Sequence, residues 1–243
     1  MIRHFLILSS SYSEGKRIAM HYIVDEKMDA QLLIDEVRKV KEHCGETVSI
    51  STHFIETDSD SWQSVVDKDA FFENVTVVET LFQFINLITN DRLLTGLDVA
   101  KYILSTAKMT HLKLEKLVYF CYAEYLCLRH KKLFDDDIFA FRYGPVVESV
   151  YKKYKGSRQL DIEKPARSRI LFAQDGIEKL AVIDDTLRKY GYLSSTALVN
   201  ITHTSGSPWD MVDSTTDYAT IPDEVILAHH KKEIQCFLSM SSR

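Results

Sequence analysis

The sequence predicts an α+β protein of two modules, and three observations support this class. Strand-like alternation and helical periodicity succeed one another through residues 1–93, which indicates a small α/β module. From residue 94 onward the apolar residues recur mostly at helical spacing, so residues 94–243 are expected to form a mostly helical domain with a short β-hairpin. The chain has 243 residues, of which 45% are apolar and 27% charged, which is enough for two ordinary domains with real cores.

Two strands and two helices are expected in the first module. Residues Ile18–Val24 alternate loosely and residues Thr47–Glu56 alternate cleanly between apolar and polar side chains, as half-buried strands do. Between them, Asp29–Cys44 has apolar residues at near-helical spacing, and Gly45 stands where a glycine commonly ends a helix. The apolar face of the second strand is expected to carry Val48, Ile50 and Phe54, and a second helix is indicated by Val78, Leu81, Phe82, Ile85 and Ile88.

Helix caps and periodicity organise the second module. Thr95 followed by Asp98 resembles a capping box, in which two side chains satisfy backbone amides at a helix start. Thr110 is placed to cap the longest helix, about His111 to His130, whose apolar residues extend far around the cylinder and predict a central position. Further helices are expected at about 180–190, after Ser194 or Ser195, from Ser207 and from Pro222, the last one carrying Ile234, Phe237 and Leu238.

A short hairpin is expected within the second module. Residues 138–142 alternate after the polar turn Asp135–Asp137, and residues 169–173 are the expected partner strand. Between these two segments, Tyr143-Gly144-Pro145 is expected to open a helix, because proline is favoured in the first helical turn and glycine permits a corner before it.

The two modules differ in charge. Residues 1–94 hold 9 lysines and arginines against 16 aspartates and glutamates, a net of −7, and the remainder holds 21 against 19, a net of +2. An acidic first module disfavours nucleic acid there and suits a basic protein partner.

Targeting segments and cofactor sites are not expected. Phe5–Leu8 is too short for a secretory segment, which needs about 7–15 apolar residues, and no stretch approaches the roughly 18 of a membrane span. We therefore expect a soluble, cytoplasmic protein without a membrane partner. The four cysteines form no CxxC pair and are expected to be buried free thiols: Cys44, Cys121, Cys127 and Cys236.

Three patterns admit a chemical interpretation, and in each the structural one is favoured. Asp135–Asp137 resembles a metal or carboxylate site, but consecutive acids point apart, so a solvated turn is expected. Thr202–Ser205 contains a histidine near a serine but no nucleophile elbow, so helix capping beside a packed Trp209 is expected. Residues 151–158 mix lysines with tyrosines, as nucleic-acid surfaces do, although lysines also complement a helix end. No constellation supplies a nucleophile, base and oxyanion donors together, so an enzyme is not expected.

A family resemblance rests on three groups of motifs in fixed order. They are VAKYIL with THLKLEKLVYF (99–104 and 110–120), LFD with FRYGPVV (133–135 and 141–147), and YG with TH and SPW (190–191, 202–203 and 207–209). With these gaps, residues 94–243 resemble the Panacea (SocA-like) antitoxin domain family of toxin–antitoxin systems. Residues 1–93 lie outside the resemblance.

The resemblance implies an antitoxin that neutralises a co-encoded protein toxin by direct binding, without a cofactor. Such domains are also found in phage and mobile-element proteins, and one domain pairs with many unrelated toxins. In the SocA branch the antitoxin also delivers its toxin to a AAA+ protease. Proteolytic delivery, or a regulatory role that includes binding DNA, therefore remains an alternative. The acidic module, residues 1–93, is interpreted as a source of toxin specificity.

Seven motif residues are candidates for partner contacts. Lys113, Lys116 and Tyr119 repeat along the long helix, either as a polar strip at a partner surface or as lysines extending over a core helix. The other four are Tyr143, Gly144 and Pro145, which form the expected corner, and Trp209.

Overall fold

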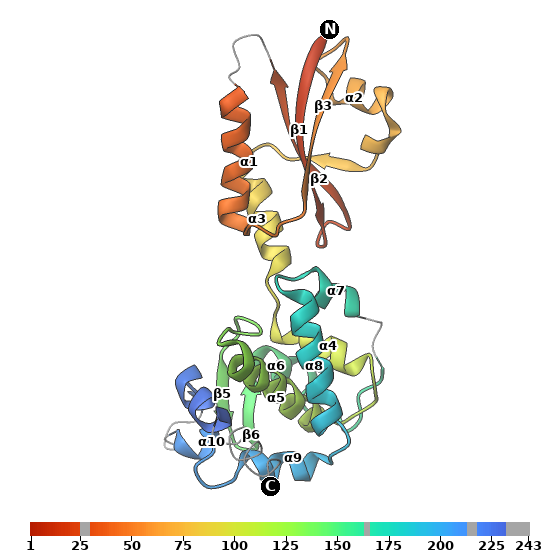
Figure 1. Cartoon of the computed structure of the whole chain (residues 1–243). Coiled ribbons are helices and arrows are strands. Elements are labelled where there is room, and N and C mark those ends of the chain that lie inside the picture. Colours follow the sequence, from red (N-terminus) through yellow and green to blue (C-terminus); the bar gives the residue numbers. More distant parts are fainter. Residues whose placement is uncertain (25–29, 163–165, 213–217, 232–243) are drawn as a thin grey trace, which may run out of the picture. The chain divides into compact units, whose positions relative to one another are not determined.

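The computed structural model describes residues 1–24, 30–162, 166–212 and 218–231 (Figure 1). The chain divides into two compact units, Met1–Arg92 and Leu93–Arg243. Each unit has its own hydrophobic core, and the first combines a sheet with helices while the second is mostly helical. These elements confirm the α+β class.

A four-stranded sheet of order β3-β1-β2-β4 forms the centre of the first unit. The central strand β1 (Ile2–Ser11) pairs antiparallel with β2 (Lys16–Val24) and with β3 (Ile50–Thr57). The short edge strand β4 (Val75–Val77) runs parallel to β2. Gly15, with φ +64°, lies in the turn between β1 and β2, where its conformation suits a residue without a Cβ.

Helices cover both faces of this sheet. Helices α1 (Ala30–Cys44) and α3 (Leu81–Arg92) pack on one face, while α2 (Trp62–Lys68) and the 3-10 turn η1 (Ala70–Phe72) pack on the other (Figure 1). The sheet contributes Phe5, Ile7, Ile18 and Met20 to the first layer and Leu6, Leu8 and Ala19 to the second.

The covering of both faces explains why β1 was not predicted. Phe5 and Ile7 enter one core, and Leu6 and Leu8 enter the other, so the segment is a continuous apolar run. A strand that is buried on both faces lacks the alternation that identifies a half-buried strand. The three short elements α2, η1 and β4 were not predicted either.

The helix that ends at Cys44 and both predicted strands are confirmed, with small changes of bounds. Gly45 adopts φ +91°, and its backbone nitrogen donates to Lys41 O at 2.8 Å, as expected of a helix-ending glycine. Phe54 faces Phe5 across the strands, with ring centroids 4.8 Å apart, but is 66% exposed because β3 is an edge strand. It is therefore not a core residue.

Helix α3 buries fewer of the expected apolar residues than predicted. Phe82 is 74% exposed, so it does not belong to the buried face of α3. Val78 precedes the helix, and its backbone nitrogen donates to Ala19 O at 2.9 Å, which continues the pairing with β2.

Helix α5 (His111–Arg129) is the centre of the second unit, as predicted. It is buried along most of its length among α4 (Gly96–Leu104), α8 (Gly176–Tyr190) and α9 (Ser195–Thr202) (Figure 1). Thr110 caps it by accepting from the Lys113 nitrogen at 3.1 Å, and the predicted capping box at the start of α4 is present. The remaining helices are α6 (Glu148–Tyr154), α7 (Arg167–Phe172), α10 (Pro208–Met211) and residues 223–231.

The hairpin is present, but its second strand was predicted wrongly. Strand β5 (Ile138–Phe141) pairs with β6 (Gly144–Val147) on one side and with β7 (Ala219–Thr220) on the other. The predicted partner, residues 169–173, lies mostly in α7, and Tyr143-Gly144-Pro145 opens a strand instead of a helix. Pro145 is tolerated because β6 is an edge strand, where a missing backbone N–H removes little pairing.

Several smaller expectations are settled as well. Cys44, Cys121 and Cys127 are buried free thiols, while Cys236 and the expected core residues Ile234, Phe237 and Leu238 lie outside the described residues. Within the described part of the chain, no helix is long and apolar enough to cross a membrane.

Candidate functional site

Gly144 brings the hairpin close to the central helix. Its φ of +103° lies in the region that favours glycine, and a Cβ at this position would approach Thr202 Oγ1 to 2.6 Å and Lys116 Nζ to 3.2 Å. Both the conformation and the space therefore require glycine here. The next residue, Pro145, accepts a hydrogen bond on its carbonyl from Lys116 Nζ at 2.7 Å.

Lys116 is a fully buried lysine on α5. Its ammonium group donates to Pro145 O, which ties the hairpin to the helix. Burial lowers the pKa of Lys116 to about 7, although the neighbouring Glu115 acts in the opposite direction.

Glu115, the preceding residue, is only 3% exposed. None of the described residues donates a hydrogen bond to its Oε1 atom, which is itself buried. Burial raises the pKa of Glu115, while Lys116 and His111 oppose the shift. A buried carboxyl oxygen without a donor is rare in folded proteins, because desolvation is then uncompensated.

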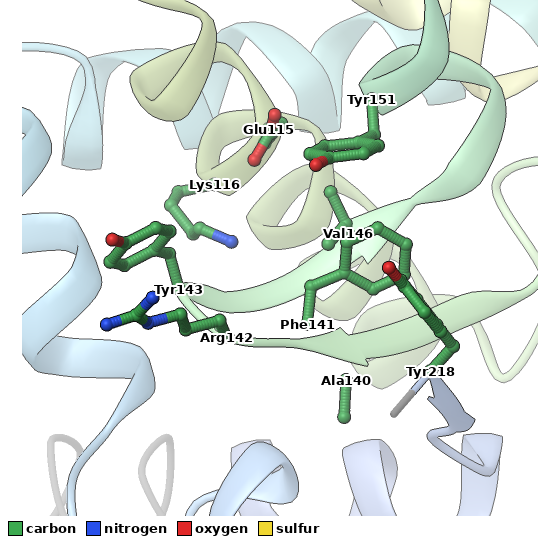
Figure 2. A pocket seen from close by; sticks show the side chains of 10 residues that line it. Glu115, Lys116, Ala140, Phe141, Arg142, Tyr143, Val146, Tyr151 and Tyr218 are labelled. Atoms are coloured by element: carbon green, nitrogen blue, oxygen red, sulfur yellow. The ribbon is translucent and has the colours of Figure 1, made fainter. Parts of the chain in front are cut away.

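These two residues line a pocket of about 310 Å³ between the hairpin and α5, which we call the hairpin pocket (Figure 2). Its lining residues are Glu115, Lys116, Ala140, Phe141, Arg142, Tyr143, Gly144, Val146, Tyr151 and Tyr218. The Phe141 ring lies edge-on to Tyr151 at 4.8 Å and to Tyr218 at 4.5 Å. The pocket thus combines aromatic walls with two buried ionisable groups.

The rim of the hairpin pocket is exposed. Tyr143 and Tyr218 are 54% and 60% exposed, and the Arg142 guanidinium lies 5.4 Å from the Tyr143 ring centroid. Exposed tyrosine and arginine around a concave site are typical of protein-binding surfaces.

Trp209 also contacts the hairpin, through strand β5. Its Nε1 donates to Phe141 O at 2.7 Å, and its ring stacks on His203 with centroids 3.8 Å apart. Ser207 caps α10 by accepting from the Asp210 nitrogen, and it donates to Thr202 O. These contacts confirm the expected capping beside a packed tryptophan and leave no serine paired with His203 in the described residues.

The seven candidate residues therefore fall into two groups. Lys116, Tyr143 and Gly144 line the hairpin pocket, and Pro145 and Trp209 support it. The other two lie elsewhere on α5: Lys113 Nζ donates to Gly191 O at 2.7 Å, and Tyr119 is buried with its hydroxyl 3.4 Å from His230 Nε2. The three α5 candidates do not form one exposed strip.

The aspartate turn is structural, but it is not simply solvated. Asp136 accepts from the Gly96 nitrogen at 2.8 Å and from Ser149 Oγ at 2.9 Å, which links the turn to α4 and α6. Asp135 and Asp137 are exposed. Among the residues that the structure describes, no group of three or more His, Cys, Asp or Glu side chains is arranged to hold a metal ion.

Seven lining residues of the hairpin pocket were not among the candidates, and four of these have polar or ionisable side chains: Glu115, Arg142, Tyr151 and Tyr218. Glu115 is adjacent to Lys116 on a helix predicted to be central, and that adjacency was the available signal. Arg142 and Tyr151 stood in recognised segments without an assigned place, and Tyr218 reaches the site only through the pairing of β7 with β5.

Comparisons with known proteins show what the domain around this pocket is similar to. Residues 114–210 match the family described as "Antitoxin SocA-like, Panacea domain", a range that includes every residue of the hairpin pocket except Tyr218. Antitoxin SocA from Caulobacter vibrioides (strain NA1000 / CB15N) is 28% identical over 120 residues, which cover 43% of this chain and 60% of that protein. No solved structure matches significantly.

Part of the second unit, residues 114–210, thus matches the SocA-like Panacea domain that the motifs indicated. The matched segment spans about three fifths of the relative and excludes the first unit of this chain.

Proposed function

We propose that this chain is the antitoxin of a toxin–antitoxin pair and neutralises a protein toxin by binding it directly. The observation that carries the proposal is the match of residues 114–210 to an antitoxin domain family. The toxin is expected to be encoded by the neighbouring gene, and the binding needs no cofactor and no chemistry by this chain.

The hairpin pocket is the proposed centre of the toxin contact. Stable protein complexes bury about 1,200–2,000 Å² in total, and tyrosine and arginine are enriched among the residues that contribute most to binding. Arg142 and Tyr143 on the hairpin and Tyr218 beside β7 are exposed around a concave site, so they supply anchors of this kind. A preorganised surface also loses little side-chain entropy on binding.

We further propose that the acidic first unit contributes specificity for a basic toxin. Residues 1–94 carry a net charge of −7, which would accelerate encounter with a basic partner and discriminate against acidic ones. Because such steering is screened by salt, the association rate with the toxin should fall steeply with ionic strength. A rate that is independent of salt would remove this role.

Co-expression with the adjacent reading frame tests the proposal. The neighbour alone should stop growth, and this chain should restore growth and co-purify with the neighbour in stoichiometric amount. If growth returns while the neighbour protein disappears, delivery to a protease replaces neutralisation by binding. If the neighbour is harmless and does not co-purify, the toxin assignment is wrong.

A further inference from the structure

The hairpin pocket contains an acceptor without a donor. Glu115 is 3% exposed, and within the described residues nothing donates to its Oε1 atom. The uncompensated desolvation of a carboxyl group costs more than that of a neutral polar group, so the free protein tolerates an unfavourable arrangement at this position. Oε1 itself is buried, but Glu115 lines a pocket that opens to the surface, so a donor from another molecule can approach the other oxygen of its carboxyl group.

The walls of the pocket favour a flat cation as that donor. Phe141, Tyr151 and Tyr218 contribute aromatic rings to the same pocket that Glu115 lines (Figure 2). A guanidinium group is planar, stacks on aromatic faces and presents several N–H donors to one carboxylate. A lysine ammonium lacks this flat surface and is more strongly hydrated, so it gains less from such walls.

The two cations at the site do not reverse this preference. Lys116 already donates to Pro145 O, and burial lowers the pKa of Lys116, just as burial raises the pKa of Glu115, so burial disfavours the charged form of each. Arg142 is exposed, where solvent screens its charge, and it lies over the Tyr143 ring. An anionic ligand would lie near the Glu115 carboxyl and would leave Oε1 without a donor.

We propose that the hairpin pocket receives an arginine side chain of a protein partner, whose guanidinium donates to the Glu115 carboxyl group between the aromatic walls. The volume of about 310 Å³ suits one side chain entering from a partner surface. The identification of that partner as the toxin rests on the proposed function, whereas the preference of the pocket for a guanidinium group does not.

The test titrates the full chain with N-acetyl-L-arginine methylamide and follows the pocket tyrosines by NMR. The lysine, glutamine and glutamate analogues serve as comparison probes. The arginine probe should bind in the millimolar range and at least about tenfold more tightly than each of the others. Equal binding of the glutamine probe, or tighter binding of the lysine or glutamate probe, overturns the proposal.

Variants assign the binding to the pocket. Glu115→Gln should weaken binding of the arginine probe at least about tenfold. Glu178→Gln, which alters a partly exposed glutamate on α8 that pairs with Arg129 of α5, should leave the affinity unchanged. Tyr218→Ala removes an exposed wall residue and should weaken the probe severalfold even if Glu115→Gln fails to fold. Undiminished affinity in a folded Glu115→Gln protein, or in Tyr218→Ala, contradicts the proposal.

The toxin experiment is separate from the probe experiment. Arginine-probe binding without rescue of growth would refute the antitoxin function and retain the guanidinium site. Rescue of growth without selective probe binding would retain the function and refute the site.

Discussion

Replacing Gly144 with alanine perturbs the contact on which the hairpin pocket depends. The residue has φ +103°, a conformation that costs an L-residue about 1–2 kcal/mol. The new Cβ would also lie 2.6 Å from Thr202 Oγ1 and 3.2 Å from Lys116 Nζ, and overpacking of this kind typically costs about 1–3 kcal/mol. Together these effects predict that the free energy of unfolding falls by about 2–5 kcal/mol.

A matched glycine separates the two contributions. Gly156 has φ +83°, but a Cβ there would meet nothing within 4 Å, so Gly156→Ala should lose only the conformational part, about 1–2 kcal/mol. Urea unfolding of the full chain, followed by circular dichroism and, in a Trp62→Phe background, by the fluorescence of Trp209, measures both variants. Equal losses at the two positions would refute the close packing of the hairpin against α5.

Three further predictions concern Lys116, Trp209 and Thr95. The folded-state pKa of Lys116 is lowered, so the unfolded chain binds more protons above pH 7, and the free energy of unfolding should rise by up to about 1.4 kcal/mol per pH unit as pH increases from about 7 toward 10.5. Lys116→Met should lack this increment in a pH series of urea unfolding, and a wild-type slope equal to that of the variant contradicts the burial of the charge. Trp209→Phe removes the donor to Phe141 O and should cost about 1–3 kcal/mol in the same assay, whereas an unchanged midpoint would show that the bond contributes nothing. Thr95→Ala removes the side-chain acceptor of the capping box and should lower the free energy of unfolding by about 0.5–2 kcal/mol in the same assay. An unchanged free energy of unfolding would show that solvent satisfies the α4 amides equally well.

The sequence predicted the elements whose signals are local. Thr95 and Thr110 cap their helices as expected, because a cap depends on a few neighbouring residues. Gly45 ends α1 for the same reason. Strand β1 was missed because helices cover both faces of its sheet, and that covering is a property of the whole unit.

The hairpin shows where local reasoning failed. Pro145 carries the same local preference for a helix start as for an edge strand, and pairing with β5 decides between the two. The candidate residues Lys116 and Gly144 were recognised as motif residues, but their approach to each other requires the hairpin to fold onto α5. Tyr218 directly precedes β7 and reaches the same pocket because β7 pairs with β5. A pairing between segments so far apart in the sequence cannot be predicted from residue spacing.

The central claim, neutralisation by direct binding, is tested most directly by co-expressing the full chain with the adjacent reading frame and measuring growth and co-purification in the same cells. The account predicts that the neighbour alone is toxic, and that this chain restores growth while the neighbour persists in a stoichiometric complex with it. A harmless neighbour that does not co-purify, or restored growth without any complex, would contradict the account.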